Sequence, residues 1–424
     1  MREMKDSGIE WVGAIPQDWQ LSKIGSLYTQ RNEKVSDKDY QPLSVTMQGI
    51  LPQLATAAKT DDGDNRKLVR VGDFAINSRS DRRGSCGISP LDGSVSLINI
   101  ILTPRTAMHP GYYNWIFHTT LFADEFYKWG HGIVADLWTT RWQEMKSITV
   151  PVPEYAEQER IAAFLDAECA EIDTVLEKTR ASIEEYKKLK QAVITQAVTK
   201  GIRGDRPMKD SGIEWIGEIP AGVPISRVGL HFDIVLGKML CSAPVDDNYT
   251  LESYYCAADV HFEGLSNGEK KKMWFSPDEK EQYCVKSGDL LVVEGGAGAG
   301  GCAIAASTDV PIYIQNSIMI VRSKGISNIR YLRYLLECLV KKGYIDVVCN
   351  KATIPHFTKD KLANVPFIVF SQSEQEEIAE YLNEKCAGID ALIAKKQQYL
   401  TEIETYKKSL IYEYVTGKKE VHPL

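Results

Sequence analysis

The chain has 424 residues, of which 44% are hydrophobic and 25% are charged. This is the composition of an ordinary soluble protein of two or three domains. No signal peptide opens the chain, and no apolar run reaches the roughly 18 residues that a membrane span needs, so a cytoplasmic protein is predicted. Its 9 cysteines are dispersed and never form a CxxC pair, which favours reduced thiols and gives no zinc signature.

The net charge of −7 first argues against a nucleic-acid partner, but its distribution changes that interpretation. Residues 154–200 and residues 371–424 each carry 10 acidic and 7 basic side chains, a net charge of −3 apiece. Residues 1–153 are neutral, and residues 201–370 carry a net charge of −1. Nearly neutral regions can present basic patches, whereas acidic helices are poor surfaces for phosphates.

A short segment near the start of the chain is duplicated. Residues 4–16, MKDSGIEWVGAIP, recur as residues 208–220, MKDSGIEWIGEIP, with 11 of 13 positions identical at an offset of 204. After each copy comes a region of about 140 residues with short strand and helix signals, which we call the first head (residues 17–153) and the second head (residues 221–370). Each head is predicted to be a mixed α/β domain.

The two heads align weakly with each other. Residues 71–76, VGDFAI, pair with residues 287–292, SGDLLV, as a turn entering a strand. Residues 95–102 pair with residues 313–319, with Asn99 matched to Asn316, and helices are predicted at residues 112–118 and 331–341.

After its Gly-Asp strand, the first head carries a polar loop rich in arginine. Asparagine and arginine can bind base edges with two hydrogen bonds, and serine and arginine also bind phosphates. The alternative is a solvated loop with no ligand. The candidate DNA-binding residues are Asn77, Ser78, Arg79, Arg82 and Arg83.

A long helix follows the first head over residues 157–201. Apolar residues recur at sums of three and four, at Ile161, Leu165, Ile172, Val175, Tyr186, Leu189 and Val193. About 40 residues without proline make a rod of roughly 60 Å. Gly201 occupies the place of a left-handed residue that ends a helix. A single helix leaves this narrow apolar stripe exposed to solvent, so a partner helix that covers it is expected.

The second head offers different candidates for DNA contact. A lysine triplet beside an aromatic residue suits phosphate contact, although such runs are also common on solvated surface. A glycine loop then stands where the first head has its arginines. It matches GxGxxG in form, but the stretch before Pro311 is too short for a dinucleotide-binding crossover helix, so close approach of backbone to DNA or to another loop is favoured. The candidates are Lys270, Lys271, Lys272, Trp274, Gly296 and Gly298.

The partner helix lies in the same chain. Residues 374–416 repeat residues 157–199 at an offset of 217, including polar matches such as Lys178 with Lys395 and Glu185 with Glu402. Leu382, Ile389, Leu392, Ile403, Tyr406 and Leu410 continue the stripe. The polar matches do not follow from a heptad pattern, so the helices are duplicated. The duplicated helices join two similar heads, which predicts a pseudo-two-fold internal repeat. In such a repeat both heads are expected to have the same function but to act on different targets.

Catalytic signals are absent from the sequence. It contains no tetrapeptide of the type with which amino-methyltransferases orient a target amine, no HExxH, no serine–histidine–aspartate arrangement and no helicase motif. We therefore expect no enzymatic activity, no metal site and no cofactor bound by this chain. Two heads on rods of this length could read DNA about one helical turn apart.

These features together resemble the specificity subunit of a type I restriction–modification system. The resemblance rests on the Ser-Gly-Ile-Glu-Trp segments, the Glu-Gln-x-x-Ile helix starts (residues 157–161 and 374–378) and the paired variable heads. It implies an α+β fold with two target-recognition domains, each reading half of a bipartite DNA site, joined by two long antiparallel helices that form a coiled coil. It also implies two modification subunits that methylate adenine with S-adenosylmethionine, and restriction subunits that use ATP and Mg²⁺.

The resemblance divides the chain into residues 1–153 and 205–370 for recognition, and residues 154–204 and 371–424 for the helical spacer. Two alternatives stay open. The chain would act as the specificity partner of another type of restriction–methyltransferase, or as a coiled-coil adaptor that binds proteins alone. Salt-sensitive DNA affinity of the assembled complex separates the adaptor from the others.

Overall fold

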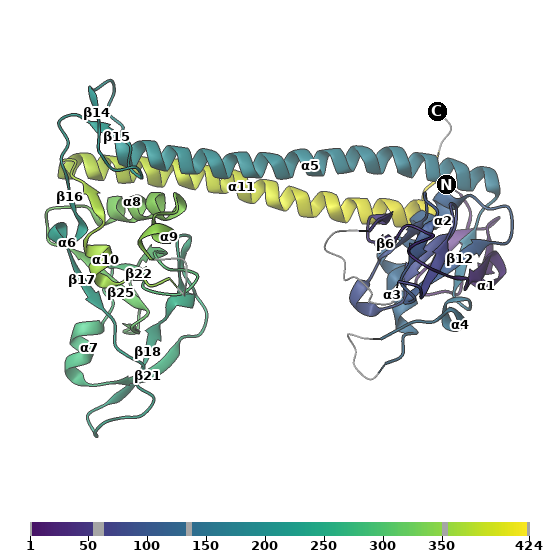
Figure 1. Cartoon of the computed structure of the whole chain (residues 1–424), viewed down its shortest axis with the longest axis horizontal. Coiled ribbons are helices and arrows are strands. Elements are labelled where there is room, and N and C mark those ends of the chain that lie inside the picture. The colour runs from purple at the N-terminus through teal and green to yellow at the C-terminus, as the bar shows by residue number, and fades with distance from the viewer. Residues whose placement is uncertain (1, 54–62, 133–137, 350–354, 422–424) are drawn as a thin grey trace. The chain divides into compact units, whose positions relative to one another are not determined.

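The computed structural model describes residues 2–53, 63–132, 138–349 and 355–421 (Figure 1). It divides into two compact units. Unit 1 contains residues 1–180 and 397–424, and unit 2 contains residues 181–396. Each unit therefore holds one head, one repeat segment and one end of each long helix. Because the units cut both long helices, the four-part division made from the sequence stays a prediction.

The two predicted long helices are α5 (Tyr155–Lys200) and α11 (Gln372–Val415), with 46 and 44 residues. Both are followed by a glycine in the left-handed region, with φ of 76° at Gly201 and 70° at Gly417. Glycine adopts this conformation without the steric penalty of a Cβ, so it ends the helix cleanly. The predicted role of Gly201 is confirmed.

The helices run antiparallel within each unit, as predicted. As residue numbers rise along α5, those of its partners on α11 fall. The cross-helix contacts include Asp173–Lys407 and Arg180–Glu404 in unit 1, and Lys190–Asp390 and Tyr186–Lys396 in unit 2. Exposed ion pairs contribute at most about 1 kcal/mol each, so most of the helix stability comes from the buried seam.

That seam differs in part from the predicted stripe. Val175, Leu189, Leu392 and Tyr406 were predicted on it but are 38%, 48%, 43% and 53% exposed. Ile161 and Leu165 were predicted on the stripe and are buried, and the seam of α5 continues through Cys169, Leu176 and Ile183, which were not predicted. From Cys169 these repeat every seven residues, a true heptad. The prediction chose Val175 over its neighbour Leu176, and a single-residue slip turns a helical side chain by about 100°.

Each repeat segment forms a two-stranded hairpin, and the two hairpins have the same register. In unit 1, β1 (Met4–Asp6) pairs with β2 (Ala14–Pro16), and Met4 lies opposite Pro16. In unit 2, β14 (Met208–Asp210) pairs with β15 (Glu218–Pro220), and Met208 lies opposite Pro220. The duplication seen in the sequence is therefore a structural repeat.

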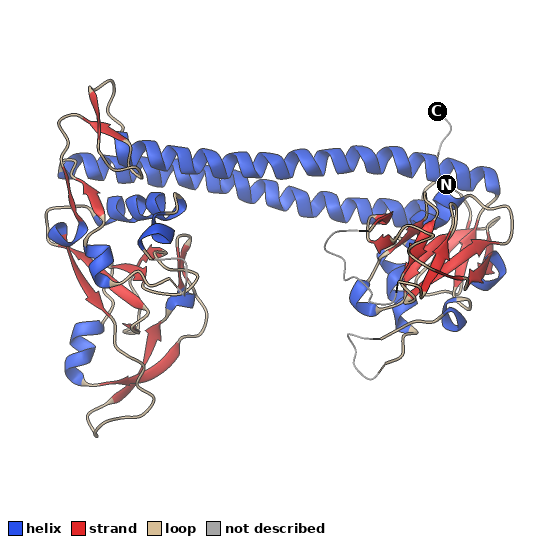
Figure 2. Cartoon of the chain, in the orientation of Figure 1, coloured by secondary structure: helices blue, strands red, loops and turns tan. Residues whose placement is uncertain are grey.

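The first head is a mixed α/β domain (Figure 2). Its strands are β3 (Gln20–Lys23), β4 (Tyr28–Arg31), β5 (Lys34–Val35), β6 (Leu43–Thr46), β7 (Gly49–Pro52), β8 (Arg66–Val69), β9 (Phe74–Asn77), β10 (Cys86–Ile88), β11 (Gly93–Val95), β12 (Asn99–Pro104) and β13 (Thr149–Val152). Its helices are α1 (Ile24–Leu27), η1 (Ser80–Arg82), α2 (Pro110–Phe117), α3 (Thr120–Lys128) and α4 (Trp142–Met145). The central antiparallel sheet has the order β10-β9-β12-β4.

The second head repeats this plan with different loops. Its strands are β16 (Ile225–Arg227), β17 (Phe232–Leu236), β18 (Thr250–Tyr255), β19 (Val260–His261), β20 (Gly264–Leu265), β21 (Lys271–Phe275), β22 (Leu290–Val293), β23 (Cys302–Ile304), β24 (Tyr313–Ile314), β25 (Ile318–Ser323) and β26 (Pro366–Ile368). Its helices are α6 (Val228–His231), η3 (Ala257–Asp259), α7 (Pro277–Tyr283), α8 (Ile329–Lys341), α9 (Tyr344–Val348) and α10 (Lys359–Ala363). The matching sheet has the order β17-β25-β22-β23.

The registers of these sheets correct one detail of the predicted alignment. Asn99 opens β12 opposite Asn77 at the end of β9. In the second head, Val293 ends β22 and lies opposite Ile318. Ile318, not Asn316, therefore holds the place of Asn99. Each predicted strand is really two strands joined by a turn, at residues 96–98 and 315–317. The two heads therefore match here at an offset of 219, and the predicted pairing of Asn99 with Asn316 was two positions too early.

Candidate nucleic-acid interface

The predicted polar loop of the first head divides into a buried start and an exposed remainder. Asn77 and Ser78 are 6% and 4% exposed. Asn77 Oδ1 accepts a hydrogen bond from the Arg79 backbone N–H at 3.0 Å, and the Ser78 hydroxyl donates to the Ile98 carbonyl at 2.5 Å. These two side chains hold the loop at the edge of the sheet. Their proposed contact with DNA stays a prediction.

The three arginines of this loop are exposed and differ in what they contact. Arg83 forms an ion pair with Asp124, and its guanidinium lies 5.7 Å from the Tyr127 ring centroid. Arg82 lies 3.7 Å from its neighbour Asp81. Arg79 forms no ion pair with any residue that the structure describes. Arg79 and Arg82 are thus the less restrained cations of this loop.

A cavity of about 280 Å³ opens beside Arg79, and sequence reasoning missed it. Its lining adds Lys67, Asn99, Arg141 and Trp142, which come from separate parts of the first head. Burial lowers the pKa of Lys67, whose ammonium donates to the Asn99 carbonyl at 2.7 Å. No local motif marks these residues. β8 and β12 belong to different sheets, so the lining forms only where these two sheets pack together, and no pattern in the sequence marks that contact.

The lysine triplet of the second head does not act as a unit. Lys270 binds within its own turn, donating to Asp259 at 3.1 Å and to the carbonyls of Ser266 and Gly268. Lys271 and Lys272 are exposed on β21, and Trp274 is half-buried. Lys271 and Lys272 are therefore better placed than Lys270 for a phosphate.

The predicted glycine loop packs against another loop of the same head. The Gly296 N–H donates to the Pro355 carbonyl at 3.2 Å, and the Phe357 N–H donates to Glu294. Gly296 has a φ of 91°, which favours glycine, and Gly298 is exposed. Close approach to another loop, one of the two alternatives from the sequence, is thus observed, while contact with DNA stays a prediction.

Each head is fixed to the helix ends by two equivalent side chains. In unit 1 the Tyr112 hydroxyl donates to the Val415 carbonyl at 2.9 Å, and in unit 2 the Tyr331 hydroxyl donates to Val198 at 3.0 Å. Gln158 and Gln375, near the starts of the helices, accept from the backbones of His109 and Asn328. Each head therefore contacts the end of one long helix and the start of the other.

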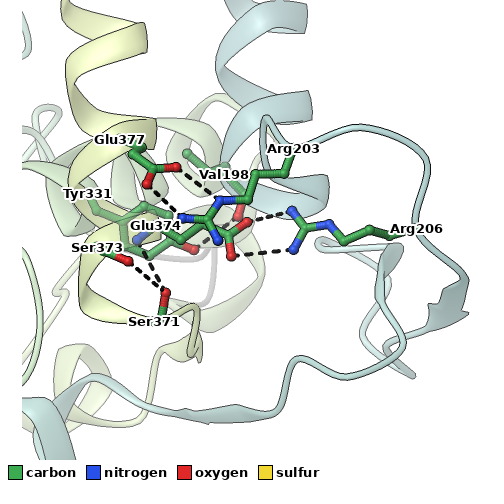
Figure 3. Close-up of polar contacts among 8 residues, drawn as sticks. All are labelled: Val198, Arg203, Arg206, Tyr331, Ser371, Ser373, Glu374 and Glu377. Carbon is green, nitrogen blue, oxygen red and sulfur yellow. Dashed lines mark hydrogen bonds and ion pairs between the residues drawn. The ribbon is translucent and has the colours of Figure 1, made fainter.

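Ion pairs join the residues just before each repeat segment to the start of a long helix, and those of Arg206 and Arg2 are partly buried. Arg206 binds Glu374 through two contacts of 2.5 and 3.3 Å, and Arg203 binds Glu377 through contacts of 2.6 and 3.0 Å (Figure 3). Arg203 lowers the pKa of the Glu377 carboxyl. In unit 1, Arg2 binds Glu157 in the same way.

The residues of this pair follow the two repeat offsets, so it is itself duplicated. Arg2 and Arg206 are 204 positions apart, and Glu157 and Glu374 are 217 positions apart. Sequence reasoning missed the pair because its arginine lies just outside the repeated segment.

The described part of the chain gives no sign of a metal centre or of a membrane span. Within it, no group of three or more His, Cys, Asp or Glu side chains could hold a metal ion. Within the same residues, no helix is both long enough and apolar enough to cross a bilayer.

Comparison with known proteins finds that this chain is similar to specificity subunits of restriction systems. A family model described as "Type I restriction modification DNA specificity domain" matches residues 263–402. The chain is 24% identical to the type I restriction enzyme MjaVIII specificity subunit of Methanocaldococcus jannaschii, over 97% of this chain and 95% of that protein. It is 25% identical to the putative MjaX specificity subunit of the same organism, over 66% of this chain and 61% of that protein.

Two solved structures share the fold. One comes from work on complex assembly and conformational transition of the type I R-M system, with a TM-score of 0.74 and 16% identity over 96% of this chain and 99% of that one. The other is the HsdS subunit from Thermoanaerobacter tengcongensis, with a TM-score of 0.55 and 17% identity over 96% of this chain and 98% of that one.

Proposed function

The chain belongs to the specificity subunits of type I restriction–modification systems, and we propose that each of its heads reads one half of a bipartite DNA site. It is a DNA-recognition subunit without catalytic activity of its own. Recognition by two heads on one scaffold gives a discontinuous target, because each head contacts only the bases beneath it.

The observation that carries this proposal is a shared frame with unlike loops. Both heads have the same central sheet, and both bind the helix ends through the same tyrosine and glutamine positions. At the end of the matching strand, one head presents arginines and the other presents glycines. A constant frame with variable loops suits one task carried out on two different base sequences.

The long helices would set the separation of the half-sites and dock two modification subunits. Exposed apolar residues along them support docking, since single-chain packing leaves them uncovered: Val175, Leu189, Leu392, Tyr399 and Tyr406. S-adenosylmethionine, ATP and Mg²⁺ would be used by the modification and restriction subunits. The purified chain supplied with all three should neither methylate nor cut DNA, and turnover by the chain alone would contradict the assignment.

A head exchange tests the proposal directly. The chain is co-expressed with its modification subunits, and the methylated adenines of the host are sequenced. Replacing residues 17–153 by the first head of another specificity subunit should change one half-site and leave the other intact. A change in both half-sites would show that the heads do not read independently.

Single-residue changes separate base reading from phosphate contact. Arg82→Ala should cost about 1–3 kcal/mol at one base pair if Arg82 binds a guanine edge. Arg83→Ala is the matched variant, because Arg83 is already paired with Asp124. Lys271→Ala should weaken binding equally on all sequences and reduce its salt dependence. Equal losses on all sequences for Arg82→Ala would instead assign that arginine to a phosphate.

A spacer insertion tests the role of the helices. Seven residues added to each long helix, at residues 180–190 and at the matching positions of α11, should lengthen the unread spacer between half-sites. The half-site sequences themselves should not change. An unaltered spacer in the methylation pattern would show that the helices do not set it.

A further inference from the structure

The cavity beside Arg79 is a built feature of the first head. It lies between β8, the start of β12 and the loop that leads into α4. The Thr140 N–H donates to the Ser78 carbonyl at 3.0 Å, and Ser78 is in turn bonded to Ile98. Backbone hydrogen bonds on both sides therefore hold the walls in place.

The inner part of the cavity offers one cationic donor and one unused acceptor. Lys67 is partly buried, and its ammonium lies 2.7 Å from the Asn99 carbonyl. Asn99 is 4% exposed, and its Nδ2 donates to Ser96 at 3.0 Å. Its Oδ1 is buried with no hydrogen-bond partner among the described residues. Buried polar atoms are nearly always satisfied in folded proteins, so this oxygen calls for a donor.

The mouth of the cavity is cationic and aromatic. Arg79 and Arg141 are exposed, and neither forms an ion pair with a residue that the structure describes. The half-buried indole of Trp142 lies on the same lining. Aromatic rings stack on bases, and arginine binds phosphate. The cationic mouth suits the phosphates of a nucleotide, and the polar inner wall suits a base that enters the cavity first.

We propose that this cavity takes one nucleotide turned out of the DNA duplex, with its base inside and its phosphates against Arg79 and Arg141. The site rests on the DNA recognition proposed above and adds a specificity contact to it. In this arrangement the Asn99 amide would turn so that Oδ1 accepts from a base N–H, while Lys67 would donate to a base carbonyl. Thymine and guanine present a carbonyl beside an N–H and so fit this pair. The stack is opened to expose one base, as in enzymes that modify bases.

The second head lacks this inner wall. Its counterpart of Asn99 is Ile318, which is fully buried in an apolar cluster. We therefore assign the site to the first head.

Mononucleotide binding to the full chain tests the site without needing the recognised DNA sequence. Titrations by calorimetry would use thymidine 5′-monophosphate and, as a probe without a base, 2-deoxyribose 5-phosphate. The thymidine nucleotide should bind at one site per chain, at least tenfold more tightly than the sugar phosphate. Lys67→Met and Asn99→Leu should each remove most of that advantage, whereas Lys359→Met on α10 of the second head, an exposed lysine outside the proposed contacts, should leave it unchanged.

Equal affinity for the two probes would show a phosphate site alone and overturn the proposal. So would nucleotide binding that neither variant alters, since the nucleotide would then lie elsewhere. Thermal unfolding checks that the variants are folded. If Asn99→Leu is unstable, the exposed-face variant Arg141→Gln replaces it, with loss of phosphate affinity as the expected result.

Duplex DNA gives the second measurement. An abasic position is moved through the first half-site, and the affinities of the assembled complex and of its Lys67→Met form are compared. At one position on one strand, the abasic site should abolish the difference between the two proteins. A difference that persists at every position would refute the extrahelical base even if mononucleotides bind.

Discussion

The two places where a repeat segment meets the end of a long helix differ in their connection. In unit 2, residues 201–207 link the end of α5 covalently to the segment at residues 208–220. In unit 1 the segment at residues 4–16 meets the end of α11, although the two lie at opposite ends of the sequence. Both junctions use the same arginine–glutamate pair. The comparison shows that a repeat segment can be positioned at a helix end without a covalent link to it.

Unit 1 has additional contacts where the link is missing. The Tyr412 hydroxyl donates to the Val12 carbonyl at 3.0 Å, and Lys418 donates to Val12 and Ala14 at 2.6 and 3.1 Å. The Lys418 ammonium lies 4.4 Å from the Tyr412 ring centroid. In unit 2 the position of Tyr412 is held by Thr195, which lines an open groove of about 850 Å³. Side-chain contacts thus replace the chain connection in unit 1.

The largest effect should come from breaking the shared ion pair at the unlinked junction. Glu157 accepts from Arg2 and from the Trp19 indole at 2.9 Å, and its side chain is 14% exposed. Glu157→Ala leaves the partly buried Arg2 with Asp18 as its remaining carboxylate and leaves the Trp19 indole without its acceptor, so it is expected to cost about 3 kcal/mol of local stability. Amide hydrogen exchange of residues 2–16 measures this opening.

Glu374→Ala at the linked junction is the matched variant. It removes the same kind of pair, but the linker keeps residues 208–220 close to the helix, so exchange there should accelerate less. Similar acceleration in both segments would show that the covalent link contributes nothing to local stability.

A smaller and equal effect is expected where the two units are alike. Tyr112→Phe and Tyr331→Phe each remove one buried hydroxyl and leave helix-end carbonyls at Val415 and Val198 without that donor. Each change should cost about 1–3 kcal/mol. Chemical denaturation measures the loss. A marked inequality between the two variants would mean that the heads are not held to the helices in equivalent ways.

These equivalences show how much of the fold could be predicted from the sequence. The two long helices, the repeat segments and the shared head plan were predicted. Segments of the sequence recur at fixed offsets of 204 and 217, and repeated segments are expected to fold alike even when their contacts are unknown. The Gly201 helix end was predicted because glycine has a specific conformational role there. The seam was partly wrong, since one residue separates Val175 from Leu176 and sequence spacing alone fits either.

The candidate site was less accessible to prediction. The residue types identified the arginine loop as a candidate. They did not show that Asn77 and Ser78 are buried, or that Lys270 donates a hydrogen bond to the Ser266 carbonyl. The cavity was missed because Lys67 and Trp142 are far apart in the sequence and meet only where two sheets and a loop pack together. Which side chains face such a contact depends on the register of each sheet, and a single sequence does not report register at short strands.

Tyr412→Phe should have a moderate effect confined to unit 1. It removes one hydrogen bond to Val12 and keeps the ring beneath Lys418, so about 0.5–1.5 kcal/mol should be lost. Hydrogen exchange of residues 10–14 checks this. Thr195→Ala is the control at the matching position of unit 2 and should leave the exchange of residues 214–218 unchanged. An effect of the control as large as that of Tyr412→Phe would mean that the extra contacts do not replace the link.

The smallest effect should come from moving the chain break from one junction to the other. Trp11 lies in the same buried cluster as Leu410 at the end of α11, just as Trp215 packs against the cluster that contains Val198 at the end of α5. The predicted circular plan, with the N-terminal segment at the end of the second helix, is confirmed within unit 1. The terminal residues to be joined, Met1 and Pro423, lie outside the described residues.

A permuted chain, joined from Pro423 to Met1 by a short linker and opened near Arg203, should therefore fold and recognise the same DNA. Exposed linkers tolerate such cuts, but the new break removes the tether of residues 208–220, and unit 2 has no counterpart of Tyr412. Hydrogen exchange should consequently rise in residues 208–220 and fall in residues 4–16, while the methylated sequence is unchanged. Adding Thr195→Tyr to the permuted chain, to supply the missing contact to the Ile216 carbonyl, should slow the exchange of residues 208–220 again. Loss of folding on permutation would show that the covalent link at Arg203 is essential and that the two junctions are not interchangeable.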